Sequence, residues 1–202
     1  MQTRILNSFD SKHVGTLISN ENKGSGYPIT GISSIDQISL LRVQGSGMVG
    51  IAGTASRVFK ALAQSLTNVI LITQASSEHT ICVAISPQDG AKAKKALDSE
   101  FAYEQSLGAV APTLVEEKLS ILSVVGENMQ KCPGVSGRVF SALGRYNVNI
   151  VAIAQGSSEL NISCVIGESD LEKALNVVHD EFFLSTLQTI NSAPSPPMLS
   201  DA

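Results

Sequence analysis

Hydrophobic and polar positions follow one another along the chain in an order that predicts alternating strands and helices. Residues 39–44 alternate apolar and polar side chains, which is typical of a short strand. After a glycine-rich turn, apolar residues recur at helical spacing over 55–66, so we expect a helix with one buried face. The runs 69–73 and 80–85 are rich in β-branched residues and predict two strands. The Ser-Pro pair at 86–87 then opens a second helix as its cap and first residue.

The same pattern occurs a second time, displaced by 81 residues without a gap. Arg-Val-Phe at 57–59 recurs at 138–140, and Gln-x-Ser-Ser-Glu at 74–78 recurs at 155–159. Two copies are too few for a solenoid, which needs about three repeats or more. The chain is therefore expected to hold two small paired domains rather than one large one.

Each copy reads strand–helix–strand–strand–helix, which one further strand would complete to the split βαβ pattern of ferredoxin-like folds. For the first copy we expect this last strand within residues 108–115. For the second copy two segments qualify, 184–190 and 29–33, and the pattern does not choose between them. The fold class is α+β on either choice.

Composition narrows the classes of protein. Of 202 residues, 43% are hydrophobic and 16% charged, which excludes a disordered chain. The net charge of −4 argues against a nucleic-acid partner, since phosphate contacts need clustered Lys and Arg. No uncharged run is long and apolar enough for a membrane span, and no secretory leader follows Met1. The three cysteines are widely spaced and odd in number, so we expect a reduced, cytoplasmic compartment.

The turn after the first strand contains a literal G-x-G-x-x-G, with glycines at 45, 47 and 50. As a dinucleotide fingerprint, this motif needs a helix opening at the glycines and an acidic residue about 20 positions later. Here the helix opens only after Gly53, and Glu78 is the next acidic residue. A dinucleotide-binding enzyme fragment that uses Gly45, Gly47 and Gly50 is nevertheless kept as an alternative.

A second interpretation places a free amino acid at the same loop. Backbone N–H groups at a helix N-terminus bind anions, so the α-carboxylate of an amino acid would suit this site. Asn68 and Gln74 bracket the following strand, and Asn149 and Gln155 repeat the arrangement. A side-chain amide both donates and accepts, so it can bind a zwitterion without burying a further charge. In a third interpretation the glycines serve only tight turns and the asparagines only begin strands.

Three segments, 48–50, 68–78 and 149–159, resemble the paired ACT domains of aspartate kinases. They look most like the threonine-sensitive type found in bifunctional aspartate kinase–homoserine dehydrogenases, and the resemblance runs from about residue 4 to 183. It implies tandem ferredoxin-like ACT domains, each βαββαβ, with an antiparallel sheet and helices on one face. The implied divisions are the C-terminal edge of a kinase catalytic domain with a linker at 1–26, a first ACT domain at 27–115, a second at 116–190 and a flexible tail at 191–202.

In that family the kinase phosphorylates the side-chain carboxylate of L-aspartate with ATP, at the entry to lysine, threonine and methionine biosynthesis. The ACT pair binds an end product and inhibits the enzyme. No catalytic residue and no metal ligand can be carried over, so the chain by itself is expected to be non-catalytic and to need no cofactor. ATP and Mg²⁺ would serve the parent kinase. The resemblance favours threonine as effector, with lysine as the alternative, and implies a homodimer or tetramer formed through the ACT sheets.

The resemblance also assigns effector-binding residues in both copies. The two loops differ, because Lys-Cys-Pro at 131–133 replaces Gly-Ile-Ala at 50–52, so we expect the two sites to differ in affinity. Two further functions also fit the sequence, a stand-alone amino-acid sensor and a dimerisation module. The assigned residues are Gly47, Met48, Gly50, Gly53, Asn68 and Gln74 in the first copy, and Met129, Pro133, Gly134, Val135, Asn149 and Gln155 in the second.

Overall fold

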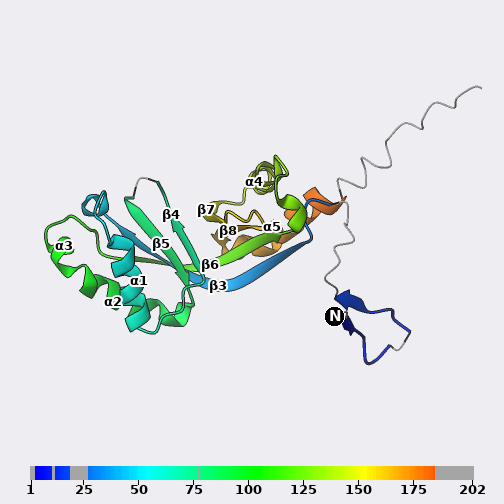
Figure 1. Ribbon diagram of the computed structural model, residues 1–202, viewed down its shortest axis with the longest axis horizontal. Helices are drawn as coiled ribbons and strands as arrows, with labels where there is room; N and C mark the ends of the chain where they lie inside the picture. The colour runs from blue at the N-terminus through cyan, green and yellow to red at the C-terminus, as the bar shows by residue number, and fades with distance from the viewer. Residues whose placement is uncertain (1–2, 11, 19–26, 77, 185–202) are drawn as a thin grey trace, which may run out of the picture.

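The computed structural model describes residues 3–10, 12–18, 27–76 and 78–184 (Figure 1). Strands β1 and β2 form a separate antiparallel hairpin, and the other six strands form one antiparallel sheet in the order β4-β5-β3-β6-β8-β7. The elements are β1 (Thr3–Ile5), β2 (Thr16–Ile18), β3 (Gly31–Gln44), α1 (Thr54–Gln64), β4 (Leu71–Gln74), β5 (Thr80–Ile85), α2 (Gly90–Glu100), α3 (Ala102–Ser106), β6 (Leu114–Val125), α4 (Val135–Arg145), β7 (Ile150–Gln155), β8 (Asn161–Gly167) and α5 (Leu171–His179).

Two long strands, β3 and β6, lie side by side at the centre of the molecule and run through both halves of the sheet (Figure 1). Residues 31–35 of β3 pair with the end of β6, whereas residues 39–44 pair with β5. The start of β6 pairs with residues 40–42 of β3. We call the first lobe β4, β5, the second part of β3, the start of β6 and helices α1 to α3. The second lobe is β7, β8, the rest of β6, the start of β3 and helices α4 and α5.

This pairing decides between the two candidates for the fourth strand of the second copy. The candidate 29–33 is confirmed from its third residue on, because β3 begins at Gly31 and pairs there with Val125. The other candidate lies almost wholly outside the described residues, as does the tail at 191–202. In the first copy the strand begins only at Leu114, near the end of the expected segment 108–115. The predicted first domain, 27–115, thus includes the first strand of the second lobe.

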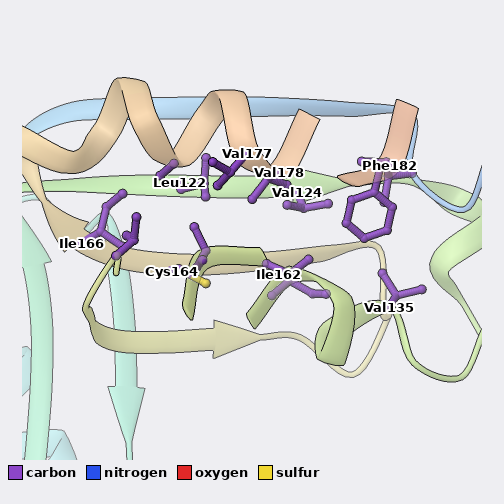
Figure 2. Packing of buried hydrophobic residues seen from close by; sticks show 14 of the residues in the cluster. Leu122, Val124, Val135, Ile162, Cys164, Ile166, Val177, Val178 and Phe182 are labelled. Carbon is purple, nitrogen blue, oxygen red and sulfur yellow. The ribbon is translucent and has the colours of Figure 1, made fainter. Parts of the chain in front are cut away.

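Each lobe has its own core between its part of the sheet and its helices. In the second lobe Leu122 and Val124 of β6 meet Cys164 of β8 and Phe182 (Figure 2). Ile29, which has no exposed surface, belongs to this core and ties the start of β3 to the second lobe. Burial raises the pKa of Cys164 to about 11, so its thiol stays protonated and packs as a small apolar group.

A third cluster occupies the faces of the sheet that point away from the helices. Because side chains alternate along a strand, Leu40 contacts this cluster while its neighbour Leu41 contacts the core of the first lobe. The cluster joins both lobes through its buried members Ile38, Leu40, Ala84, Leu119, Ile121 and Val165.

The long strands each contain a left-handed residue where they pass from one lobe to the other. Gln37 has φ 53° and Lys118 has φ 59°, and they stand at equivalent positions of the repeat. The pairing of β3 with β6 shifts register on both sides of Ile38. Such bulges bend a strand and increase its twist. The two lobes are therefore joined through a pair of strained bulges.

Replacing Gln37 with glycine is expected to raise the free energy of unfolding by up to about 1 kcal/mol, because glycine adopts positive φ without the clash of a Cβ. Ser34 lies in the extended part of the same strand and is also exposed, so Ser34→Gly should cost about 0.5–1 kcal/mol. Urea denaturation of both variants measures the contrast. An equal loss of stability in the two variants would show that the bulge stores no strain.

Candidate functional site

A cavity of about 300 Å³ lies beside the N-terminus of α1 in the first lobe. Its walls come from the loop between β3 and α1, from the first residues of the helix, and from the end of β4 with the turn that follows. The lining residues are Met48, Gly50, Ile51, Ala52, Gly53, Thr54, Ala55, Gln74, Glu78 and Ile81.

Backbone conformation explains two of the glycines in this loop. Gly50 has φ 68° and Gly53 has φ 91°, a region that side chains with a Cβ rarely adopt, although an added Cβ would meet no atom at either position. Gly53 directly precedes α1, and no side chain caps the helix. The first intrahelical bond runs from Arg57 N–H to the Gly53 carbonyl, so the N–H groups of residues 54–56 have no acceptor within the helix. The cavity is thus bordered by backbone donors that have no acceptor among the described residues and by the positive end of the helix dipole.

A carboxylate forms part of the cavity wall. Glu78, at φ 55°, accepts a 2.8 Å hydrogen bond from the Gly50 N–H through Oε2. Glu159 does the same in the second lobe, accepting from the Lys131 N–H at 2.7 Å. Both glutamates therefore tie the strand–strand turn to the glycine loop. In the first lobe this contact also places a negative charge in the cavity wall.

The two predicted glutamines differ in their surroundings. Gln74, the last residue of β4, lines the cavity, and its amide has no hydrogen-bond partner within the described part of the chain. Gln155 accepts a 3.3 Å hydrogen bond from the Ser136 hydroxyl through Oε1. Ala55 stands where the second copy has Ser136, so the first copy cannot make this bond. The amide is free to meet a ligand in the first lobe and partly engaged in the second.

Both glutamines also face a common groove of about 530 Å³ between the lobes. One wall is β4 with Ile72 and Gln74, and the other is β7 with Ile153 and Gln155. The side chains that line this groove carry no charge. It therefore offers hydrogen bonds and apolar contact, but none of the charge that the first-lobe cavity presents.

The structure brings together Met48, Gly50, Gly53 and Gln74 of the first-copy residues, all in the cavity wall. It does not place Gly47 or Asn68 there. The Gly47 N–H donates to the Ala109 carbonyl at 2.9 Å, on another side of the loop. Asn68 is exposed before β4 begins, six residues from Gln74, which is about 20 Å of extended chain.

The second-copy residues follow the same plan. Met129 is buried under the loop, and Gly134 (φ 90°) directly precedes α4, whose first residue is Val135. Pro133 is exposed in the loop between them. Asn149 precedes β7 and is exposed, at the end of that strand opposite to Gln155. In the first lobe the loop and the glutamine thus meet in one cavity, whereas in the second lobe the glutamine contacts Ser136 in the first turn of α4, and in both lobes the asparagines lie apart.

The dinucleotide alternative is wrong for this loop. A dinucleotide fingerprint belongs to a parallel sheet with the helix starting at the glycines, whereas β3 pairs only antiparallel with its neighbours and α1 starts after Gly53. Gly45 and Gly47 do not form a phosphate cradle, because a Cβ at Gly45 would lie 2.2 Å from the carbonyl oxygen of Ala109. These two glycines permit close packing of residues 109–110 instead.

Two negative findings concern the described residues, 3–10, 12–18, 27–76 and 78–184. No group of three or more His, Cys, Asp or Glu side chains gathers there closely enough to hold a metal ion. Nor does that part of the chain contain a helix with the length and apolar character needed to cross a membrane.

Comparison with known proteins identifies the family that this chain matches. The family model described as the ACT domain matches residues 41–101 and again 122–182. The chain is 40% identical over 186 residues to a chloroplastic bifunctional aspartokinase/homoserine dehydrogenase 1 of Arabidopsis thaliana, covering 90% of this chain and 20% of that protein. It is 39% identical over 179 residues to the bifunctional aspartokinase/homoserine dehydrogenase of Haemophilus influenzae, covering 89% and 22%. The chain thus spans about a fifth of the length of these relatives.

Solved structures support the fold. The regulatory subunit of aspartate kinase from Thermus flavus superposes with a TM-score of 0.66 at 24% identity, over 76% of this chain and 97% of that one. Aspartokinase III of E. coli, in complex with lysine and aspartate, gives 0.65 at 24% identity, over 87% and 37%. These superpositions support a fold of ACT domains with an antiparallel sheet and helices for this chain.

Proposed function

The chain belongs to the ACT domain family, which its two copies each match, and from this premise we propose that it is the effector-binding regulatory region of an aspartate kinase. In this proposal the region binds an end-product amino acid, with threonine favoured over lysine. Binding then controls the ATP-dependent phosphorylation of L-aspartate by a catalytic domain outside the chain. The family membership confirms the resemblance to tandem ACT domains drawn from the sequence. The observation that carries the functional proposal is the cavity at α1.

The cavity has complementary groups for the two charges of a free amino acid. The α-carboxylate would lie at the free N–H groups of the first turn of α1, where the helix dipole favours an anion. The ammonium would face the Glu78 carboxylate and the side-chain amide oxygen of Gln74. Met48 and Ile81 supply apolar contact for a small side chain such as that of threonine. A long cationic side chain would need a further carboxylate, which favours threonine over lysine.

We assign the stronger site to the first lobe. The amide of Gln74 has no partner to lose within the described chain, whereas binding at Gln155 must break or share the bond from Ser136. Exchanging one hydrogen bond for another gains less than making a new one. At the position that Gly50 holds in the first loop, the second loop has Lys131, which adds a positive charge that the first loop lacks.

Allosteric control follows from differential affinity. If the lobes have two arrangements and the ligand binds one of them better, occupancy shifts the population toward that arrangement. Self-association fits the same scheme, because β4 and β7 are the last strands in the sheet order and each is hydrogen-bonded to only one neighbouring strand, although the two face one another across the common groove. We propose a homodimer or tetramer in which such edges meet.

The hairpin β1–β2 supports an origin in a larger protein. Phe9 is 99% exposed and Val14 70% exposed, so the hairpin displays apolar side chains that a neighbouring domain would cover. In the proposal residues 1–26 complete the edge of a kinase catalytic domain, and ATP with Mg²⁺ binds in that domain. The cytoplasmic location stays a prediction, because several relatives are described as chloroplastic.

Isothermal titration calorimetry of this chain with L-threonine, L-lysine and L-methionine tests the proposal. We expect heat and saturation with L-threonine at submillimolar to millimolar concentration, and weaker or no binding of the other two. A chain that binds none of the three at 10 mM would refute the proposed function. Saturable binding of L-lysine alone would support the proposed regulatory region but show that its effector is lysine instead of threonine.

A further inference from the structure

The charged side chains behind the first-lobe cavity form a clamp on Arg57, the fourth residue of α1. Its Nε donates to Glu100 Oε1 at 2.7 Å, and Nη1 donates to Glu104 Oε1 at 2.5 Å. Nη2 donates to the Glu100 carbonyl at 2.8 Å, and the guanidinium carbon lies 4.5 Å from the centre of the Phe101 ring. This clamp, Arg57 with Glu100, Phe101 and Glu104, ties the first turns of α1 to the junction of α2 and α3.

The segment that follows the clamp also contacts the other end of the same loop. The Gly47 N–H bonds to the Ala109 carbonyl at 2.9 Å, and Gly45 lies so close to that residue that a Cβ would clash. Residues 45–57, which form the main wall of the cavity, are therefore held at both ends by residues 100–110. The loop and that segment are thus in direct contact at two places.

The same segment leads into β6, the strand that crosses to the second lobe. Asp98 fixes the entry, since its carboxylate accepts from the Thr113 N–H at 2.8 Å and from Lys94 Nζ at 2.7 Å. Burial alone would raise the pKa of Asp98, but these hydrogen bonds and one from Gln105 lower it to about 2. Residues 98–113 thus form a connected unit between the cavity and β6.

The second lobe has the same arginine but a different clamp. Arg138 donates to Glu181 Oε1 at 3.1 Å and lies 4.3 Å from the centre of the Phe182 ring. The additional charge there is Arg145, which bonds to Glu181 from the same helix, α4. Ser185 stands in the sequence where the first copy has Glu104. A second carboxylate in the clamp, four residues after the first, is therefore a feature of the first copy.

We infer that Glu104 is a positioning residue for the effector cavity, an inference that rests on the proposed function. Through Arg57 it holds the first turn of α1 in the geometry that receives the ligand carboxylate, and it transmits occupancy of the cavity to α3 and β6. Its Oε2 is buried with no hydrogen-bond partner among the described residues, so the contact to another side chain that orients the carboxylate is the one from Arg57 to Oε1. The hydrogen bond from Arg57 also lowers the pKa of Glu104, which keeps it charged at neutral pH.

Glu104→Gln tests this role, with Arg145→Gln as the matched control in the second lobe. We expect Glu104→Gln to weaken L-threonine binding about fivefold by calorimetry. In the unaltered chain L-threonine should slow amide hydrogen exchange over both 45–57 and 101–113. In Glu104→Gln the slowing should be confined to 45–57. Arg145→Gln, which removes one charge from the second clamp, should leave affinity and both exchange patterns unchanged.

The outcomes separate this inference from the proposed function. An unaltered chain that binds no L-threonine, L-lysine or L-methionine refutes the function itself. An unaltered chain that binds, together with a Glu104→Gln variant of equal affinity and an equal exchange pattern, overturns the positioning role. If Glu104→Gln does not show a cooperative unfolding transition, Arg57→Lys replaces it as the test variant. Lysine keeps the positive charge but cannot make the forked contact of Arg57 to Glu100 and Glu104. Slowed exchange at 101–113 that persists in Arg57→Lys would equally overturn the role.

Discussion

Replacing Gln74 with alanine is expected to weaken L-threonine binding at least about tenfold, while Gln155→Ala weakens it less than about threefold. The Gln74 amide lines the cavity without a competing partner in the described chain, so its oxygen can accept from the ligand ammonium. A hydrogen bond to a charged group contributes about 1.5–3 kcal/mol, and 1.4 kcal/mol corresponds to tenfold in affinity. Gln155 begins with a bond to Ser136, so its loss removes less net binding energy.

Calorimetric titration of both variants measures this contrast, and Asn68→Ala is the negative control. Asn68 lies at the far end of β4 from the cavity, so its replacement should leave the dissociation constant unchanged. Equal losses in the two glutamine variants would show that the lobes contribute equally. Unchanged affinity in both would remove the glutamines from the site, and a loss in Asn68→Ala would place the ligand along the strand instead.

Local pattern predicts most of the elements but not the way the lobes share them. The apolar spacing over 55–66 and the β-branched runs predict α1, β4 and β5, because one buried face dictates the period. The exchange of β3 and β6 between the lobes depends on pairing between residues about 90 positions apart, such as Gly31 with Val125. Two segments fit the fourth strand equally well by pattern, and the pairing of Gly31 with Val125 together with the burial of Ile29 in the second core identifies the segment that forms it.

The candidate site, too, is predictable from the sequence only where a local pattern determines it. The loop with Met48, Gly50 and Gly53 is predictable because glycines before a helix have a local physical reason. Glu78 serves its turn, as its position in the sequence suggests, yet the fold also carries its carboxylate into the cavity wall. Its recurrence as Glu159 is the signal that the sequence offers for this role. Asn68 lies apart from the cavity because sequence spacing does not tell which end of a strand meets the loop.

Replacing Phe182 with alanine is expected to lower the free energy of unfolding by about 3–5 kcal/mol, the usual cost of removing a buried phenylalanine. The ring is completely buried in the second-lobe core (Figure 2). It also lies 4.3 Å from the Arg138 guanidinium carbon, measured to the ring centre. Phe101 holds the same position in the first lobe and is 1% exposed, so Phe101→Ala should cost a similar amount. For a chain of this size the melting temperature should fall by roughly 6–20 °C.

The shared strands make this pair of variants a test of the architecture. Since β3 and β6 each contribute to both lobes, loss of one core should destabilise the whole sheet, and both variants should lower one common transition. Differential scanning calorimetry distinguishes this from independent lobes, which would give two transitions with only one displaced in each variant. Phe182→Leu is the control, because it keeps most of the buried volume and should cost only about a third as much. Two separate transitions would mean that the exchanged strands do not couple the lobes, and transmission from α3 through β6 would then lose its physical basis.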